Sequence, residues 1–336
     1  MIEQNVSLQP YNTFGLSAKA KLMARVSDVA SLQGVLVDSA VAKEERFILG
    51  GGSNILLTKD IDGLVIKNEI DGIQVLEETA DSFLVKSGAG VVWHDLVMHC
   101  IQNNYAGIEN LSLIPGNVGA APMQNIGAYG VELKNVFHSL EAVEMATGDA
   151  QTFTASECNF GYRESVFKRK LKGQFIISSV TLNLSKTASL NTSYGAIEQE
   201  LERLNISSPT IQDVSKAVIN IRQSKLPNPK ELGNSGSFFK NPVVPTSKYE
   251  ELKASHPNIP GYPAGEKTKL AAGWLIEQCG WKGKVVGNTG SHKMQALVLV
   301  NYGNASGVEI YQLSEQIMQS VYDTFGVQLE REVNVY

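Results

Sequence analysis

Three polar side chains lie in short motifs whose residue types suit proton transfer and the stabilisation of negative charge. Arg163 follows Gly-Tyr, Ser237 lies within the glycine-bearing stretch 233–242, and Glu332 lies close to the last residue of the sequence. A guanidinium can pair with charge that develops during a reaction, whereas a hydroxyl or carboxyl with suitable neighbours can move a proton. Each residue alone also fits an ordinary surface ion pair or a turn. Together they predict a site that has a proton donor and charge stabilisers.

Other kinds of catalytic site are disfavoured by residue spacing. Ser237 lacks the G-x-S-x-G motif of a nucleophile elbow, and no histidine stands out as its base. His94 and His99 are five residues apart, which does not place two ligands on one face of a helix. No C-x-x-C pair occurs among the three cysteines, which are Cys100, Cys158 and Cys279. We therefore expect no metal site and no disulfide framework.

Two glycine-rich stretches suit the binding of an anionic cofactor. Residues 113–130 contain four glycines, three alanines, two prolines and no charged residue. Glycine allows close approach of the backbone to a ligand and frees N–H groups to point outward. Gly50-Gly-Gly-Ser-Asn54 also offers N–H and side-chain donors to a phosphate, although it is neither a Walker A motif nor G-x-G-x-x-G. The plain alternatives are a tight loop packed on a helix for the first stretch and a hairpin turn for the second.

A third stretch, residues 83–93, looks at first like a dinucleotide-binding fingerprint. Trp93 occupies the place of the third glycine, and the helix that follows lacks the expected acidic partner. The stretch therefore predicts a strand–turn–helix joint and not a Rossmann domain.

Hydrophobic periodicity and capping residues predict the elements that position these motifs. A helix is expected from Ser27 or Asp28 to about residue 42, and another over 206–225 with Thr210 and Asp213 in capping-box positions. Further helices are expected at 270–278 and 306–324. Strands are expected at 47–49, 55–57, 64–66, 140–145, 151–154, 175–184, 295–300 and 328–335. The proline-flanked segment 226–229 is the best candidate for a domain boundary.

Length and composition describe an ordinary globular protein. A chain of 336 residues with 43% apolar and 19% charged residues is expected to form two or three domains. The 29 basic and 34 acidic residues give a net charge of −5 without a basic block, which disfavours a dedicated nucleic-acid binder. The N-terminus lacks a signal-peptide pattern, and no apolar run approaches the roughly 18 residues of a membrane-spanning helix. We expect a soluble, cytoplasmic protein.

Several long motifs, in the same order along the chain, resemble those of the UDP-N-acetylenolpyruvoylglucosamine reductase family of bacterial flavoenzymes. The resemblance covers nearly the whole chain, from Asn12-Thr-Phe-Gly15 to Glu332. It includes Leu49-Gly-Gly-Gly-Ser-Asn54, Ile114-Pro-Gly-Asn-Val-Gly119, Gln124-Asn-Ile-Gly-Ala-Tyr-Gly130, Gly161-Tyr-Arg163, Lys225-Leu-Pro-Asn-Pro229 and Gly236-Ser-Phe-Phe-Lys-Asn-Pro242. Tyr262, in a proline-rich loop, resembles the form of the family that has an extra lid segment over the substrate.

This resemblance implies an α+β protein with the three-part FAD-binding fold of the vanillyl-alcohol oxidase class and a substrate-binding α+β lid domain. The implied parts are 1–69 with the C-terminal strand 329–336, then 70–225, then the substrate domain 226–328. The implied FAD contacts are Gly50, Gly51, Gly52, Ser53, Asn54, Pro115, Gly116, Gly119, Asn125, Gly127, Ala128 and Ile177. Ala120 and Ala121 depart from relatives that often have serine or glycine there, so side-chain hydrogen bonds from that corner are expected to be absent.

The resemblance also implies the reduction of the enolpyruvyl ether of UDP-N-acetylglucosamine enolpyruvate to UDP-N-acetylmuramate, a peptidoglycan precursor. In the family, NADPH reduces FAD, and flavin N5 passes hydride to the methylene carbon of the ether. Arg163 would pair with the charge that develops on the substrate, Glu332 would stabilise the enolic intermediate, and Ser237 would give the proton. The implied substrate contacts are Tyr162, Tyr194, Lys225, Asn241, Tyr262 and Gln295. The expected partners are these small molecules alone, with no nucleic acid, no membrane insertion and a monomeric state.

Two alternatives belong to other classes. A non-catalytic nucleotide-binding or sensor protein on the same scaffold need not keep Arg163, Ser237 and Glu332 together. A different flavin oxidoreductase, such as an alcohol oxidase, has no evident use for Ser237 and Lys225.

Overall fold

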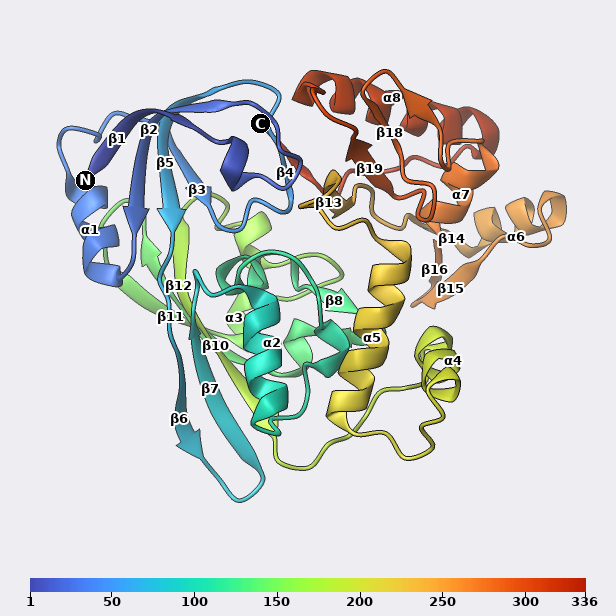
Figure 1. Cartoon of the computed structure of the whole chain (residues 1–336), viewed down its shortest axis with the longest axis horizontal. Helices are drawn as coiled ribbons and strands as arrows, with labels where there is room; N and C mark the ends of the chain where they lie inside the picture. The colour runs from blue at the N-terminus through green and yellow to red at the C-terminus, as the bar shows by residue number, and fades with distance from the viewer. The chain divides into compact units, whose positions relative to one another are not determined.

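Residues 1–336 are all described by the computed structural model (Figure 1). Their segments fall into two units. The first unit contains Met1–Val6, Ala20–Gly51 and Asp62–Arg222, and the second contains Ser7–Lys19, Gly52–Ile61 and Gln223–Tyr336. Each unit therefore draws on separate parts of the sequence. The three-part division expected from the family resemblance stays a prediction.

A four-stranded sheet in the first unit has the order β1-β2-β5-β3. Its strands are β1 (Ile2–Ser7), β2 (Lys19–Val26), β3 (Arg46–Leu49) and β5 (Ile61–Asn68). Strand β3 runs parallel to β5. A parallel pair cannot be joined by a tight turn, so the intervening residues 50–60 must form a longer connection.

Helix α1 (Val29–Val37) lies between β2 and β3 in the sequence. It begins as predicted with Asp28, whose carboxylate accepts a hydrogen bond from the Ser31 N–H at 2.6 Å. The predicted end near residue 42 is wrong, because the Asp38 carboxylate accepts a hydrogen bond from the Ala40 N–H at 2.9 Å. Such a local bond offers the backbone an alternative to the helix.

A five-stranded antiparallel sheet, in the order β11-β10-β12-β7-β6, forms the other layer of the first unit. Its strands are β6 (Ile73–Glu78), β7 (Ser82–Gly88), β10 (Phe137–Glu144), β11 (Ala150–Thr154) and β12 (Phe175–Ser185). Residues 176–182 of the central strand β12 are all buried, including the polar Ser178, Ser179 and Thr181. The strands predicted at 140–145, 151–154 and 175–184 are confirmed.

Short elements follow β7. Helix α2 (Trp93–Gln102) starts after the turn 89–92, which confirms the predicted strand–turn–helix joint. The Trp93 side chain is buried, and its indole N–H donates to the Leu111 carbonyl at 3.0 Å. The remaining short elements are the helix α3 (Ala155–Cys158), the strands β8 (Gly127–Ala128) and β9 (Val131–Glu132), and 3₁₀ turns at Glu109–Leu111, Val118–Ala120, Pro122–Gln124, Leu133–Asn135 and Val166–Lys168.

Two helices, α4 (Gly195–Arg203) and α5 (Ile211–Lys225), follow β12 in the sequence. The Asp213 carboxylate accepts the Thr210 N–H at 2.9 Å, and the Asp213 N–H donates to the Thr210 hydroxyl, as the predicted capping box requires. The predicted start of α5 at residue 206 is wrong. Pro209 restricts Ser208 to extended conformations, so the helix begins only after it.

The second unit contains two larger sheets and one strand pair. The first sheet, in the order β13-β19-β18-β17, has strands β13 (Gly233–Ser237), β17 (Val285–Val286), β18 (Thr289–Ser291) and β19 (Val298–Asn301). The second, in the order β14-β16-β15, has strands β14 (Val243–Pro245), β15 (Gly261–Ala264) and β16 (Lys267–Leu270). Strand β4 (Ile55–Leu56) pairs in parallel with β20 (Asn334–Val335).

Helices α6 (Thr246–Ser255), α7 (Ala272–Gln278) and α8 (Gly307–Phe325) complete the second unit, together with a 3₁₀ turn at Gln9–Tyr11. Helix α8 begins with a Ser306–Glu309 capping box and ends at Gly326 in a left-handed conformation. Its buried side chains share a core with Phe14, Leu56 and Phe238, which come from distant parts of the sequence. None of the helices in the chain is both long enough and apolar enough to span a membrane.

Three predicted elements of the second unit need correction. Helix α7 starts at Ala272, because Leu270 belongs to strand β16. Strand β19 starts at Val298, whose N–H closes a turn on the Gln295 carbonyl at 3.0 Å. The strand predicted at 328–335 is confined to β20, because the preceding residues bond to the segment 238–240 instead.

Candidate functional site

The connection 50–54 is not a hairpin. Strand β3 before it pairs with β5, whereas strand β4 after it pairs with β20, so the flanking strands belong to different sheets. The hairpin alternative for the Gly50-Gly-Gly-Ser-Asn54 motif is therefore wrong. The motif connects two sheets, and its own residues belong to neither of them.

In the first unit, Gly51 lies against the glycine-rich segment 113–130. A Cβ atom on Gly51 would lie 2.6 Å from Asn117 Oδ1 and 2.9 Å from the Gly116 Cα, so only glycine fits. The N–H groups of Gly51, Gly116 and Asn117 donate no hydrogen bond within the protein. Amides held in this way need an outside acceptor, and adjacent free amides form a nest for an anion. The two glycine motifs thus meet, as the prediction of one anionic ligand requires.

The segment 113–130 is anchored on the turn between β7 and α2. The Gly119 N–H donates to the Ala89 carbonyl at 2.9 Å, and the Gly116 carbonyl accepts the Trp93 N–H at 2.9 Å. A Cβ on Gly119 would come within 2.6 Å of the Ala89 Cβ, so this contact also requires glycine. The plain alternative was a tight loop packed on a helix. The segment instead bonds to the turn residue Ala89 and to Trp93, the first residue of α2, and this packing gives no role to the free amides.

Arg163 lies over the backbone of the same segment. Its guanidinium donates to the Gly127 carbonyl at 2.6 Å and to the Asn125 carbonyl at 3.4 Å. Arg163 has φ +53°, a left-handed conformation that non-glycine residues rarely adopt. The buried Asn125 side chain holds this corner, since it donates to the Gly161 carbonyl at 3.0 Å and accepts the Lys134 N–H at 3.0 Å. The left-handed backbone of Arg163 and the bonds of Asn125 thus place the guanidinium beside the carbonyls of residues 125–127.

Aromatic side chains border this corner. Tyr162 is 40% exposed and its ring centroid lies 5.5 Å from the Arg163 guanidinium carbon. Tyr194, half exposed, packs edge-to-face on Tyr129 with ring centroids 5.4 Å apart. Ile177 is buried, and its carbonyl accepts a hydrogen bond from the Asn68 amide at 2.8 Å. Tyr162 and Tyr194 are thus exposed to solvent, whereas Ile177 is only 5% exposed.

Arg222, on α5, also contacts the segment 113–130, although it was not among the predicted site residues. Its Nε donates to the Leu113 carbonyl at 3.2 Å, and the pKa of its guanidinium is lowered by burial despite a hydrogen bond with Tyr129. Repulsion from Arg163 lowers this pKa further. Two guanidinium groups therefore act on the segment 113–130. The only sequence signal was the position of Arg222 three residues before the Lys225 motif.

His94 holds the first residue of that segment. Its Nδ1 accepts the Leu113 N–H at 3.0 Å, where Leu113 has φ +58°. This bond needs a neutral imidazole, and burial, helped by Arg222 and opposed by Asp95, lowers the His94 pKa from its usual value. His94 is therefore a packing residue and not a ligand.

The lowered pKa of His94 predicts a loss of stability in mild acid. As pH falls below about 6.5, the unfolded state takes up the proton before the folded state does, so the free energy of unfolding decreases. His94→Asn keeps an acceptor for Leu113 but does not titrate in this range. Urea unfolding at pH 7 and pH 5.5 should show a smaller decrease in the variant than in the wild type. An equal decrease would show that His94 contributes nothing to the acid sensitivity.

In the second unit, Ser237 and Glu332 lie on neighbouring backbone segments. The Glu332 N–H donates to the Phe238 carbonyl at 2.8 Å, and the Lys240 N–H donates to the Glu330 carbonyl at 2.8 Å. The Asn54 side chain also donates to the Glu332 carbonyl, at 3.3 Å. Ser237 is exposed and Glu332 partly so. Three of the sequence motifs therefore meet at Glu332.

The second half of the Gly50–Asn54 motif also needs glycine. Gly52 has φ +63°, and a Cβ there would lie 1.9 Å from the Tyr11 carbonyl oxygen. The Gly52 carbonyl accepts the Thr13 N–H at 3.1 Å. The N–H groups of Gly52 and Ser53 donate no hydrogen bond within the protein. The close approach of Gly52 to Tyr11 and its bond to Thr13 give a structural role to the distinctive Tyr11-Asn-Thr-Phe-Gly15 stretch, which packs against the glycine loop.

The predicted substrate contacts of the second unit differ in their surroundings. Lys225 and Tyr262 are exposed. Asn241 Oδ1 accepts the Ala272 N–H at 3.0 Å, and Gln295 Oε1 accepts the Leu297 N–H at 3.4 Å. Asn241 and Gln295 therefore have structural hydrogen bonds, and their amide N–H₂ groups are the atoms that they can offer to a ligand.

The predicted site residues are divided between the two units. The first unit holds Gly50, Gly51, Pro115, Gly116, Gly119, Asn125, Gly127, Ala128, Tyr162, Arg163, Ile177 and Tyr194. The second holds Gly52, Ser53, Asn54, Lys225, Ser237, Asn241, Tyr262, Gln295 and Glu332. In the first unit, Gly51 contacts the segment 113–130. In the second unit, Asn54 is bonded to Glu332.

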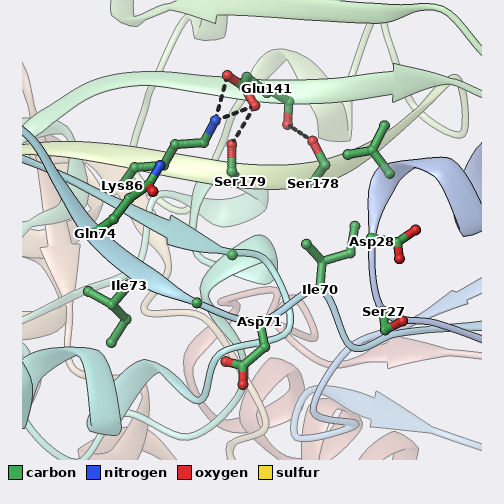
Figure 2. Close-up of a pocket in the computed structure, with 13 residues that line it drawn as sticks. Ser27, Asp28, Ile70, Asp71, Ile73, Gln74, Lys86, Glu141, Ser178 and Ser179 are labelled. Carbon is green, nitrogen blue, oxygen red and sulfur yellow. Dashed lines mark hydrogen bonds and ion pairs between the residues drawn. The ribbon is translucent and has the colours of Figure 1, made fainter.

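Figure 2 shows a different hollow in the first unit, of about 350 Å³, which no predicted site residue lines. The Lys86 ammonium there donates to both Glu141 carboxylate oxygens, at 2.8 and 2.7 Å, and Ser179 donates to the same carboxylate at 3.0 Å. The lysine charge is thus already neutralised within the hollow. No three or more histidine, cysteine or acidic side chains gather in the chain to hold a metal ion.

Comparison with known proteins relates both glycine loops and the Ser237 motif to one family. The model of an FAD binding domain matches residues 20–156, and the model described as "UDP-N-acetylenolpyruvoylglucosamine reductase, C-terminal domain" matches 228–336. The chain is 54% identical over 336 residues to the UDP-N-acetylenolpyruvoylglucosamine reductase of Flavobacterium johnsoniae, covering 99% of each. It is 47% identical to that of Pseudomonas savastanoi pv. phaseolicola, covering 100% of this chain and 99% of the relative.

Solved structures show the fold. The chain is similar to the UDP-N-acetylenolpyruvylglucosamine reductase of Thermus caldophilus, with a TM-score of 0.69 at 22% identity and coverage of 100% and 99%. It is also similar to p-cresol methylhydroxylase, with a TM-score of 0.54 at 13% identity over 97% of this chain and 85% of that one. The predicted α+β fold with an FAD-binding part of the vanillyl-alcohol oxidase class is confirmed.

Proposed function

Because the chain belongs to the UDP-N-acetylenolpyruvoylglucosamine reductase family and is an FAD-dependent oxidoreductase, we propose that it reduces UDP-N-acetylglucosamine enolpyruvate to UDP-N-acetylmuramate with NADPH. We propose NADPH as the hydride source, Ser237 as the proton donor with Arg163 and Glu332 as charge stabilisers, and Lys225 as a substrate contact. We also propose that the protein is a monomer in the bacterial cytoplasm. Its cellular role is then the supply of a peptidoglycan precursor, which links it to cell shape and cell division.

The chain has the groups that a dinucleotide needs. The free amides of Gly51, Gly116 and Asn117 in the first unit can receive phosphate oxygens, and so can those of Gly52 and Ser53 in the second. Within the first unit, the amides come from two glycine-rich stretches, and such a pair suits the pyrophosphate of FAD better than the single phosphate of FMN. When bound, FAD supplies the hydride transfer that no side chain can perform.

The neighbouring positions of Ser237 and Glu332 carry the proposed chemistry. Addition of hydride to the methylene carbon of the enolpyruvyl ether leaves negative charge on the adjacent carbon and its carboxylate. Arg163 pairs with this charge, Glu332 stabilises the enolic form, and Ser237 delivers the proton that completes the reaction. The backbone bonds that join residues 238–240, directly after Ser237, to residues 330–332 support a shared role for Ser237 and Glu332. A serine is a weak acid, so the site must stabilise its alkoxide.

Lys225 is proposed to bind the diphosphate of the UDP-sugar. Lys225→Ala should raise the KM for the UDP-sugar by roughly 10–100-fold, as expected for the loss of one charge-assisted hydrogen bond, and should change the KM for NADPH much less. Lys230→Ala, at an exposed lysine outside the motif, is the matched control and should change neither. Steady-state kinetics with each substrate varied in turn measures both values. Equal effects of Lys225→Ala on the two KM values would contradict the assignment.

The activity itself is tested by product analysis. Purified protein, NADPH and UDP-N-acetylglucosamine enolpyruvate should yield one UDP-N-acetylmuramate for each NADPH consumed, as measured by mass spectrometry and absorbance. NADPH consumption without this product would favour the other enzymatic reading, a flavin oxidoreductase that acts on a different substrate.

A further inference from the structure

Asn234 connects two sequence motifs of the second unit through one buried side chain. It is only 4% exposed. Its amide nitrogen donates to the Pro227 carbonyl at 3.1 Å and to the Leu232 carbonyl at 2.8 Å, and its Oδ1 accepts the Gly236 N–H at 3.0 Å. One end of the side chain therefore holds the segment that follows Lys225, and the other end holds the residue that precedes Ser237.

The Ser237 end needs this support because the strand is irregular there. The pairing of β13 with β19 changes register between Asn234 and Ser237, and Gly236 has φ +70°. Such a bulge removes backbone groups from the ladder and redirects the next side chain. Ser235 gives no help, since its hydroxyl is buried and has no partner. Asn234 Oδ1 thus replaces the missing ladder partner of the Gly236 N–H.

Asn234 holds the segment after Lys225 at two places, since its amide nitrogen is bonded to the carbonyls of Pro227 and Leu232. The Asn234 N–H also donates to the Thr13 carbonyl at 3.0 Å, which ties the residue to the stretch that supports Gly52. Asn234 is therefore fixed on three sides, and the two motifs cannot shift independently while it is in place.

We propose that Asn234 is a positioning residue that sets Ser237 and the Lys225 segment at a fixed separation. The inference rests on the proposed function, in which Lys225 binds the diphosphate and Ser237 protonates the reduced carbon of the same substrate molecule. A rigid separation lets the bound diphosphate determine where that carbon lies relative to the Ser237 hydroxyl. Misplacement of a reacting group by about 1 Å costs about 10²-fold in rate.

Two variants separate the two ends. Asn234→Asp keeps an acceptor for the Gly236 N–H but cannot donate to Pro227 and Leu232, so it loosens the Lys225 segment alone. Asn234→Ala loosens both ends. Asn301 is the matched control, because it is also a buried asparagine, on the paired strand β19, with three hydrogen bonds, made to Phe14, Gly303 and Ala305. Asn301→Ala tests the general cost of removing such a side chain.

Half-reaction kinetics and UDP binding give the functional readout. In Asn234→Ala, oxidation of the NADPH-reduced protein by the UDP-sugar should slow by about 10²-fold, while reduction by NADPH stays near the wild-type rate. In Asn234→Asp, the Kd for UDP, measured by calorimetry, should rise about tenfold with a smaller loss of rate at saturation. Asn301→Ala should change neither. If Asn234→Ala and Asn301→Ala behave alike in both half-reactions, the inference is overturned.

Hydrogen exchange tests the positioning without any substrate. The peptide that contains Gly236 and Ser237 should exchange at least about tenfold faster in Asn234→Ala than in the wild type, and Asn234→Asp should retain most of the protection. If Asn234→Ala does not fold, the Asp variant still tests the inference, because it should expose the 227–232 peptide selectively. Unchanged exchange in both peptides overturns the inference. A wild-type protein that does not turn over the UDP-sugar would instead reject the proposed function.

Discussion

In the Ser237→Ala variant, reduction by NADPH should proceed at nearly the wild-type rate, whereas oxidation by UDP-N-acetylglucosamine enolpyruvate should slow by at least roughly 10²–10⁴-fold. The reason is that the two half-reactions need different protein groups. Reduction by NADPH needs no acid at position 237, whereas the substrate carbon must receive a proton before product forms. The loss exceeds this range if the closed site keeps water from the protonated face.

Stopped-flow absorbance separates these half-reactions. Ser237→Cys is the conservative comparison, because a thiol has nearly the size of a hydroxyl and is a stronger acid, so it should recover part of the lost rate. A Ser237→Ala variant that is slow in reduction by NADPH and normal in oxidation by the substrate would show that Ser237 is not the proton donor.

Gly51→Val should greatly weaken FAD retention. The valine Cβ would overlap Asn117 Oδ1, at 2.6 Å, and the Gly116 Cα, at 2.9 Å. The Gly116 backbone cannot retreat easily, because its carbonyl is bonded to the Trp93 N–H. An overpacking cost of about 1–3 kcal/mol corresponds to roughly 5–150-fold weaker binding if it falls on the bound conformation. The variant should therefore lose its yellow colour on desalting.

The control is Gly34→Ala in helix α1, where a Cβ would meet no atom within 4 Å. It should keep FAD and gain stability, because alanine is the better helix former by about 1 kcal/mol. Flavin absorbance per protein after desalting measures retention, and the cofactor released by heat should be FAD and not FMN. A Gly51→Val protein as yellow as the wild type would contradict the placement of the cofactor beside Gly51.

Local signals allowed much of the fold to be predicted. Asp28, Thr210 and Asp213 cap helices as expected, because a capping bond involves residues only three apart. The long strand β12 is evident from the alternating pattern of residues 175–184. The errors in helix ends have local causes as well: Pro209 delays α5, and the Asp38 side chain stops α1.

The pairing of strands that are distant in the sequence could not be predicted. Strands β3 and β4 are close in sequence and suggest a hairpin, yet their partners are β5 and the distant β20. The segment 328–335 has a strand pattern, but it divides its bonds between the segment 238–240 and β4. In each case the partner is selected by packing of the whole unit, which no window of the sequence contains.

Site residues were predicted where the sequence has unusual clusters of glycine. They were missed where an ordinary polar residue acts through its hydrogen bonds. Glycines at 51, 52 and 119 are explained by close contacts that a Cβ would block. Arg222 and Asn234 were not predicted, because they act through bonds to backbone carbonyls, and such bonds do not follow from residue type or from position next to a motif. The left-handed backbone of Arg163 is likewise visible only in the structure.

The most direct test of the proposed function is a single turnover without oxygen. The FAD-loaded protein is reduced with one equivalent of NADPH and then mixed with UDP-N-acetylglucosamine enolpyruvate, while flavin absorbance is followed and the quenched mixture is analysed by mass spectrometry. We expect the oxidised flavin spectrum to return together with one equivalent of UDP-N-acetylmuramate, two hydrogens heavier than the substrate. A flavin that stays reduced, or that is reoxidised without this product, would contradict it.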